Sequence, residues 1–181
     1  MRTFTKLIFA AIALSIAFIN PLQAQVPPGQ AEIFIEDDGI ENIGIIEQTI
    51  NGDTLDGGVR ANPNRIYKLK KDGVYFMQSP ILFGGDDVPD TTSTLIIVGE
   101  EGGNMPIVLS QPADGQPQFS NQVHGSLTMR NLYWPGMNLS GGSASVWTLR
   151  RSNQRLVAEK IIGENQHVGA YFQLRPVRES I

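Results

Sequence analysis

Hydrophobic and polar residues alternate in short runs along most of the chain, and a polar or glycine-rich interruption follows each run. Alternation with a period of two is typical of a half-buried β-strand. It predicts strands at 31–36, 65–69, 74–78, 80–83, 94–98, 106–109, 126–134, 145–149, 155–162 and 168–174. The polar segments 84–93 and 110–123 are predicted to be loops.

One segment, 40–50, has helical periodicity instead. Its apolar face is formed by residues spaced i, i+3 and i+7, namely Ile43, Ile46 and Ile50. Asp38 and Glu41 precede this face with the spacing of a capping box, in which Asp replaces the usual Ser or Thr. The pattern predicts a single helix between the first and second strands.

A motif recurs within the β region. Short strand-like runs begin at Leu95, Leu127 and Leu156, which are 32 and 29 residues apart. A period near 30 with one such strand per repeat predicts a β-solenoid, in which each rung buries its apolar side against the next.

The aligned repeats predict which side chains face the interior. The inward positions are all apolar: Leu95 and Ile97, Leu127 and Met129, Leu156 and Ala158. On the outward side, Arg130 and Glu159 fall at one position of neighbouring rungs and should form an exposed ion pair. In the earlier strand 65–69 the alternation is ambiguous, and we favour Tyr67 and Leu69 as the inward residues.

The position after each aligned strand is occupied by Gly99, Asn131 and Lys160. Gly and Asn tolerate a positive φ angle, which predicts a sharp left-handed bend within each rung. Lys160 departs from this pattern.

The N-terminal segment has the features of a secretory signal. Arg2 and Lys6 precede 13 mostly apolar residues at 7–19, and a small residue at Ala24 is suited to cleavage before Gln25. The run is short for a membrane span. We expect a signal peptide at 1–24, a strand and capping helix within 25–64, and solenoid rungs at 65–181. The protein is therefore expected to be exported, to the cell surface, the periplasm or the medium.

Charge and composition exclude some partners. Two of the 14 basic residues but none of the 18 acidic residues lie in the signal, so the mature chain has a formal charge of −6. This disfavours nucleic acid as a partner. No cysteine is present to form a disulfide. No apolar run after residue 24 is long enough to span a membrane.

The segment 126–136, SLTMRNLYWPG, resembles the rungs of right-handed parallel β-helix proteins of the pectin-lyase-like superfamily. The segments 62–67, 73–75 and 95–102 look like the start of secreted β-helix repeat proteins of the Bacteroidetes type. The resemblance implies an all-β, right-handed parallel β-helix of about four rungs, capped by the helix at 40–50. Such relatives usually run longer, so we expect a C-terminal continuation or a partner chain to cover the last rung.

Few residues indicate chemistry, and none is assigned a catalytic, cofactor-binding or metal-binding role. Asp86, Asp87 and Asp90 form an acidic loop whose oxygens are suited to calcium, although their spacing matches no EF-hand. Acidic turns are common, so we favour a solvated loop and keep calcium as the alternative. A lyase site would need a basic residue such as Arg130 beside stacked carboxylates. Glu100 and Glu101 are interpreted as a solvated turn, because their side chains diverge in an extended chain.

Aromatic residues are the remaining candidates. Tyr133 and Trp134 are consecutive, so one ring should face outward, where it can stack on a sugar, and the other should pack inside. We name both as candidate ligand contacts.

Three functions remain open. The first is a secreted or cell-surface β-helix module with a binding or structural role, directed toward a polysaccharide or cell-surface glycan. The second is the N-terminal part of a polysaccharide lyase or glycoside hydrolase whose catalytic residues lie mostly beyond residue 181, or at the face of Arg130. The third is an adhesin-like scaffold.

Overall fold

The computed structural model describes residues 31–37, 43–54, 60, 62–84, 92–112, 119–138, 145–151, 153–163 and 172–174, with the backbone alone at 145–146 and 172–174. The elements in chain order are β1 (Glu32–Ile35), α2 (Ile45–Gly52), β2 (Ile66–Leu69), β3 (Val74–Met77), β4 (Leu82–Phe83), β5 (Thr94–Gly99), β6 (Ile107–Ser110), β7 (Phe119–Val123), β8 (Ser126–Tyr133), β9 (Ser145–Leu149), β10 (Leu156–Ile162) and β11 (Phe172–Leu174). Residues 38–42 and 85–91 lie outside the described residues, and with them Asp38, Glu41 and the three aspartates of the acidic loop.

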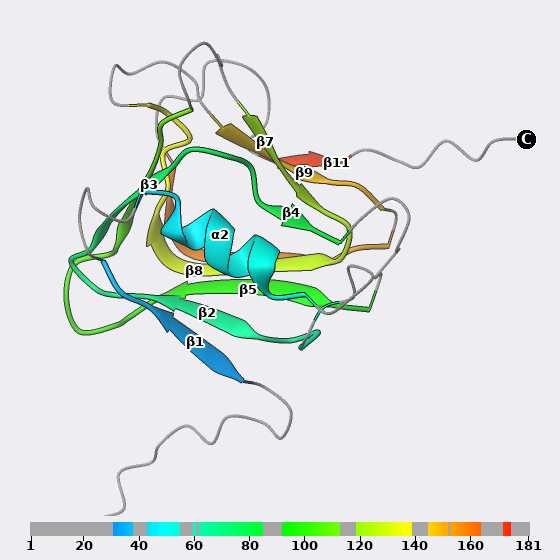
Figure 1. Ribbon diagram of the computed structural model, residues 1–181, viewed down its shortest axis with the longest axis horizontal. Helices are drawn as coiled ribbons and strands as arrows, with labels where there is room; N and C mark the ends of the chain where they lie inside the picture. Colours follow the sequence, from blue (N-terminus) through cyan, green and yellow to red (C-terminus); the bar gives the residue numbers. More distant parts are fainter. Residues whose placement is uncertain are drawn as a thin grey trace, which may run out of the picture.

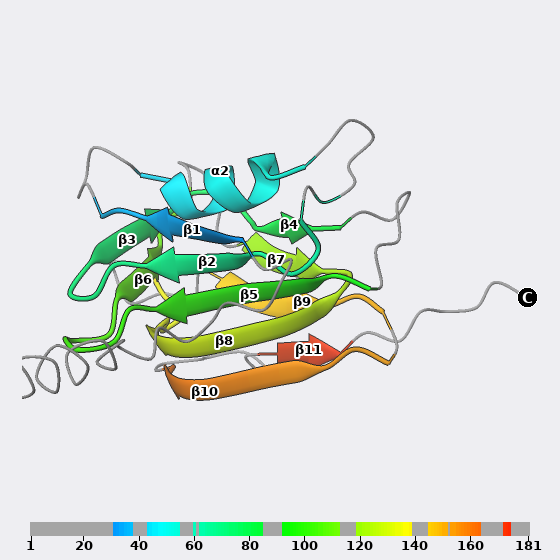
Figure 2. The same ribbon diagram turned by 90° about the horizontal axis from the view of Figure 1, so that it is seen from below.

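The strands stack in parallel to form three faces (Figures 1 and 2). The first face contains β1, β2, β5, β8 and β10 in that order. The second contains β3, β6 and the C-terminal ends of β8 and β10. The third contains β4, β7, β9 and β11. Parallel strands need crossover connections, and here the other two faces provide them.

The coil is right-handed. In Figure 1 the chain runs leftward along the first face, up the second face and back along the third. The view from below in Figure 2 shows β1 and α2 at one end of the stack and β10 at the other, with each turn receding from the viewer of Figure 1. The predicted parallel β-solenoid is therefore confirmed, with about three turns.

The predicted register of the first face is confirmed. Leu127 of β8 pairs with Leu95 of β5 on one side and with Leu156 of β10 on the other. Leu95 and Leu127 are fully buried, as are the inward residues Tyr67 and Leu69 of β2. On the outer side the guanidinium of Arg130 lies 2.9 Å from the carboxylate of Glu159, as predicted.

The bend within a rung forms at the predicted position, but its chemistry differs from the prediction. Asn131 and Lys160 adopt left-handed φ angles of 54° and 51°, so Lys160 follows the pattern that its residue type seemed to break. The amide of Asn131 donates hydrogen bonds to the carbonyls of Gly99 and Glu100 in the previous rung. These bonds tie successive bends together.

Gly99 is required for a close approach between rungs. It is not among the residues with positive φ angles. A Cβ atom at Gly99 would lie 2.0 Å from the carbonyl oxygen of Asn131 and 2.7 Å from Pro106 Cδ. The absence of a side chain therefore allows the backbones of β5 and β8 to approach at the corner of the coil.

The helix α2 covers the N-terminal end of the solenoid, as predicted, but it begins later than expected. Its N-cap is Gly44, with a φ angle of 87° and no side-chain cap, so a capping box with Asp38 at the N-cap is excluded. The Gly44 N–H group instead donates to the carbonyl of Phe76 in β3. Ile46 and Ile50 are buried against the first rung.

The strand β7 was missed, because 110–123 was predicted to be a loop. Its sequence, FSNQV, lacks apolar alternation, since the inward position is filled by Asn121. This side chain is buried, and its oxygen accepts a hydrogen bond from the N–H of Ile81. A polar residue can occupy a core position when it satisfies a buried backbone donor.

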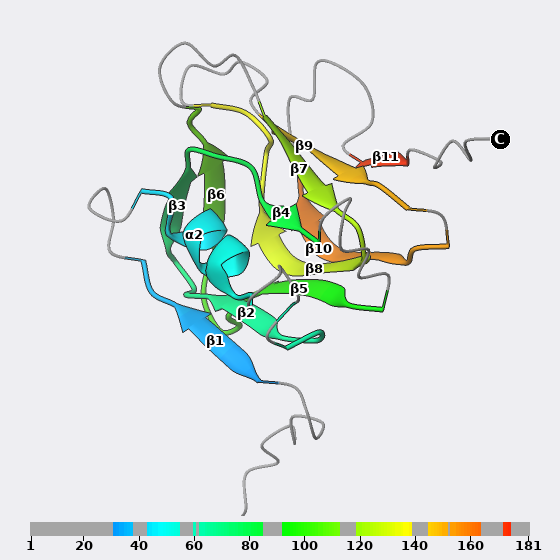
Figure 3. The same ribbon diagram turned by 45° about the vertical axis from the view of Figure 1, so that its right-hand side comes forward.

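The core is the interior enclosed by the three faces, which Figure 3 shows with α2 lying across its near end. Its largest side chains are Trp134 and Trp147, which come from the third turn of the coil. Their rings meet edge to face, with centroids 5.1 Å apart and planes at 69°. This arrangement is favourable for aromatic pairs.

Candidate functional site

The outward surfaces of the three faces differ in chemistry. The first face carries exposed charged pairs, Glu32 with Lys68 and Arg130 with Glu159, whose side chains are 32% to 58% exposed. Pairs this exposed contribute little stability. Because each of these four side chains lies within 3.5 Å of an opposite charge, the face shows no uncompensated charge at these positions. Beside these pairs runs an uncharged outward row formed by Ile66, Ile96, Thr128 and Val157.

The third face carries polar side chains from β7 and β9 on its outward side, next to the exposed Leu82 of β4. The hydroxyl groups of Ser120 and Thr148 lie 2.7 Å apart, and the guanidinium of Arg150 donates to the side-chain oxygen of Gln122. These contacts join β7 to β9 and to Arg150, the residue that follows β9. They satisfy the outward polar groups internally, which favours a structural role.

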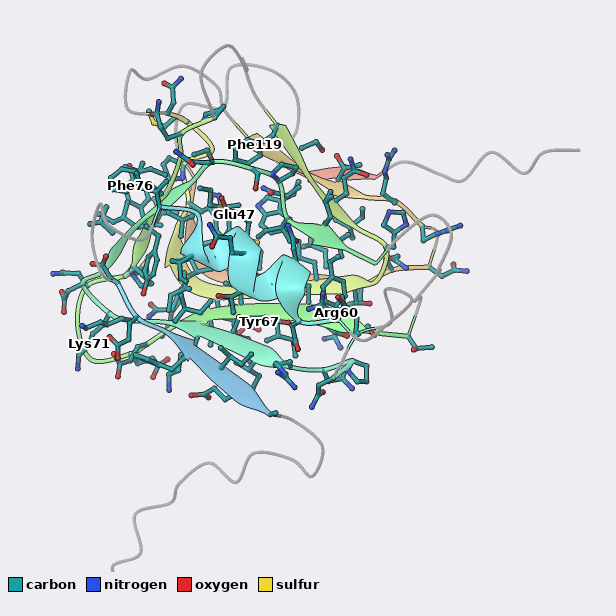
Figure 4. All side chains as sticks on the ribbon, viewed as in Figure 1. Glu47, Arg60, Tyr67, Lys71, Phe76 and Phe119 are labelled. Carbon is teal, nitrogen blue, oxygen red and sulfur yellow. The ribbon has the colours of Figure 1, made fainter. Side chains whose placement is uncertain are left out.

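The second face is apolar, and we call it the apolar face. Its outward residues come from β3, β6 and the ends of β8 and β10: Val74, Phe76, Ile107, Leu109, Tyr133 and Ile162. All are at least partly exposed, and Ile162 is 44% exposed. Figure 4 places Phe76 at the outer side of β3, away from the interior. Five of the six are partly buried, so the apolar face is a candidate interaction surface of modest exposure.

The register aligns four of these residues in one row across successive rungs. Val74 pairs with Ile107, Ile107 pairs with Tyr133, and Tyr133 pairs with Ile162. Beside this row, Phe76 pairs with Leu109. The bend at Asn131 creates this row, because it directs the last residues of β8 from the first face onto the second.

The two candidate aromatic residues have different environments. Tyr133 faces outward and is half-buried, whereas Trp134 is fully buried against Trp147. The expectation that one ring of the consecutive pair faces outward is therefore confirmed. A ring with no exposed surface has no face for a sugar, so of these two residues only Tyr133 keeps accessible surface.

A buried polar network lies beneath the C-terminal end of α2. The guanidinium of Arg60 donates to the carbonyl of Ile50 at 2.8 Å and to the hydroxyl of Tyr67. Tyr67 in turn donates to the Asp53 carboxylate at 2.7 Å, and Arg65 pairs with the same carboxylate at 3.0 Å. Figure 4 shows Arg60 and Tyr67 close together below the helix.

This network holds the cap on the solenoid. Burial, followed by the hydrogen bond to Asp53, raises the pKa of the Tyr67 hydroxyl far above its ordinary value, so the hydroxyl stays protonated and donates. The Arg60 guanidinium also lies 4.5 Å from the centre of the Phe83 ring. Because these contacts all join residues within the protein, we interpret the residues as structural. Sequence analysis did not single out Arg60.

A second buried acid, Glu47, also belongs to the cap. One carboxylate oxygen accepts the backbone N–H groups of Gln78 and Ser79 at 2.7 and 3.1 Å. Its other oxygen is buried and has no hydrogen-bond partner among the described residues. Burial raises the pKa of this carboxyl above 4.5, although the two N–H groups oppose the shift. The residue joins α2 to the end of β3.

The remaining sequence candidates do not form a catalytic cluster. Glu100 accepts a hydrogen bond from the backbone of Lys71, and Glu101 lies 3.7 Å from Lys160. These contacts fit the interpretation of Glu100 and Glu101 as a turn. Arg130 pairs with Glu159 on the next rung and with Val98 on the previous rung. Of these two stacked positions, only that of Glu159 therefore carries a carboxylate.

The apolar face was missed as a unit. Its residues were individually visible as apolar, but alternation alone cannot separate an outward apolar residue from an inward one when both neighbours are hydrophobic, as in VYFM of β3. In the sequence, the one sign of this face was that β3 has apolar or aromatic residues at both its inward and its outward positions.

Within the described residues, no group of three acidic or histidine side chains is arranged to hold a metal ion, and no helix is long and apolar enough to cross a membrane. Comparisons with protein-family models, with curated proteins and with solved structures find no match. The resemblance to the pectin-lyase-like superfamily is thus supported at the level of the β-solenoid fold, and membership of the superfamily stays a prediction.

Proposed function

We propose that this protein is an exported β-solenoid binding module, and that it binds a neutral polysaccharide along the apolar face. The observation that carries the proposal is the outward row Val74, Ile107, Tyr133 and Ile162, which crosses four rungs without a charged side chain. The N-terminal signal features support export.

A polysaccharide suits this surface for two reasons. A sugar ring presents apolar C–H faces, which pack on an aromatic ring such as Tyr133. The row also repeats once per rung, so its four residues span about 14 Å at the spacing of neighbouring strands. An extended chain molecule can follow such a row.

The lack of charge favours a neutral ligand. A polysaccharide of uronic acids would be recognised best by arginine or lysine at the contact, since such residues pair with carboxylates. The six outward residues of the apolar face supply none. The charged first face is less suitable, because its cations at Lys68 and Arg130 already pair with glutamates.

The test is a binding panel of neutral and anionic polysaccharides, measured by affinity electrophoresis and by sedimentation with insoluble polymers. Tyr133→Ala should weaken binding of a neutral polymer about tenfold, or ~1.4 kcal/mol, whereas Tyr133→Phe should retain most of it. Phe34→Ala is the matched control, because Phe34 is 40% exposed on the first face. Binding that survives Tyr133→Ala, or that is confined to anionic polymers, would contradict the proposal.

A further inference from the structure

The C-terminal end of the solenoid differs from its N-terminal end. At the N-terminal end, α2 covers the first rung and buries Ile46 and Ile50. At the other end, Leu156 is 36% exposed, although it occupies the inward position at which Leu95 and Leu127 are fully buried. The last rung is thus built like the others, and among the described residues no further layer covers it.

The backbone of β10 also has an open edge. Among the described strands, β10 pairs only with β8. The carbonyl of Arg155 accepts a bond from Leu127, so alternate residues from Arg155 onward direct their backbone groups toward β8. Leu156 and Ala158 therefore direct theirs toward the open edge, which is a template for another strand.

The charges along this edge are self-complementary. The straight part of the strand runs from Arg155 to Glu159, because the left-handed residue Lys160 then bends it. Its midpoint is Val157. If a second copy of the same segment pairs with it in antiparallel orientation about Val157, Arg155 of each copy lies opposite Glu159 of the other, and Leu156 lies opposite Ala158.

This register satisfies the hydrogen-bond geometry as well. Leu156 and Ala158 become the pair that exchanges backbone hydrogen bonds, and Val157 meets its own counterpart as a non-hydrogen-bonded pair. Inward-facing residues of one copy pair with inward-facing residues of the other, because even-numbered positions of the strand pair with even-numbered positions. The exposed apolar side chain of Leu156 then packs against the last rung of the second copy.

We propose that the protein forms a two-fold symmetric dimer through antiparallel pairing of β10 with β10. Head-to-tail assembly is disfavoured because α2 covers the other end, so the two open ends can cover each other only tail to tail. Such an interface is closed and produces no filament. This proposal does not depend on the identity of the ligand of the apolar face.

A single cysteine tests the register directly, because the natural chain has none. Val157→Cys should form a disulfide-linked dimer under mild oxidation, since non-hydrogen-bonded partners lie about 4.5 Å apart at Cα, within the range that disulfides span. Thr128→Cys is the matched control, because Thr128 occupies the same outward row one rung earlier and should stay monomeric under denaturing, non-reducing conditions.

Charge reversal supplies an independent measurement by analytical ultracentrifugation of the mature chain. Arg155→Glu or Glu159→Arg alone should raise the dimer dissociation constant at least about tenfold, because each creates two like-charge contacts across the interface, and the double variant should restore the dimer. Arg130→Gln, which removes only the internal partner of Glu159, should leave dimerisation unchanged. A monomeric protein, or a dimer that neither single reversal weakens, would overturn the proposal.

Discussion

Gly99 provides a sensitive test of how closely the rungs approach. In Gly99→Ala the new methyl carbon would lie 2.0 Å from the carbonyl oxygen of Asn131, about 1 Å inside the closest contact that Cβ atoms make. The carbonyl oxygen belongs to the backbone of Asn131, and the position of the new Cβ is fixed by the backbone of residue 99. Pro106 Cδ would also lie only 2.7 Å from this Cβ. Rotation of a side chain therefore cannot relieve the contact, and β5 and β8 must separate.

The expected cost follows from this displacement. Overpacking of a well-packed interior costs about 1–3 kcal/mol, and we expect the upper end because two stacked backbones must move. A loss of ~3 kcal/mol lowers the melting temperature of a chain of this size by roughly 6–12 °C. Thermal and urea unfolding of the mature chain, followed by circular dichroism, measure both quantities.

Gly52→Ala is the matched control for this substitution. Nothing lies within 4 Å of a Cβ at Gly52, the last residue of α2, and its φ angle is not positive. Alanine should there stabilise the protein by about 0.5–1 kcal/mol through helix propensity. The reasoning is refuted if the two variants change stability by the same amount, or if Gly99→Ala unfolds at the wild-type temperature.

Three further substitutions test the bends and the cap. Asn131→Gly keeps the left-handed φ angle but removes two amide hydrogen bonds, so it should cost about 1–2 kcal/mol in urea unfolding. Lys160→Asn should stabilise by roughly 0.5–1 kcal/mol, because Asn tolerates a φ angle of 51° better than Lys; an unchanged unfolding midpoint would contradict this. Burial raises the pKa of Glu47 above 4.5 in the folded state, so this group contributes stability below pH 4.5 that is lost as the pH rises through the folded pKa. The stability of wild type relative to Glu47→Gln should therefore fall as the pH increases over this interval, and a constant difference would exclude the raised pKa.

The sequence predicted the parts of the fold that depend on stacking. The repeat of Leu95, Leu127 and Leu156 fixed the register, and the register then placed Arg130 beside Glu159. Such predictions succeed because a one-residue slip would move every inward side chain outward.

Predictions failed where a polar group or the backbone replaced the apolar pattern. Asn121 fills an inward position of β7 because it satisfies the N–H of Ile81. Gly44 begins α2 without a side-chain cap, and Lys160 bends β10 although its residue type disfavours the φ angle. In each case a neighbouring rung or strand determines the conformation, and this neighbour is distant in sequence.

The candidate site was only partly accessible from the sequence. The consecutive aromatics indicated that one ring faces outward, but the choice of Tyr133 depends on the bend at Asn131. The alignment of Tyr133 with Ile107 and Ile162 depends on loop lengths between rungs, which alternation does not encode.

The most direct test of the account is a disulfide across the apolar face, in the row that the proposed ligand would follow. Ile107 and Tyr133 are paired on neighbouring rungs, and adjacent strands lie about 4.8 Å apart, which a disulfide can span. Ile107→Cys/Tyr133→Cys should therefore lose two free thiols on oxidation and unfold at a higher temperature. Ile107→Cys/Leu132→Cys, whose second cysteine faces the interior, should keep both thiols. Equal cross-linking in the two proteins, or none in the first, would contradict the predicted stack and the apolar face built on it.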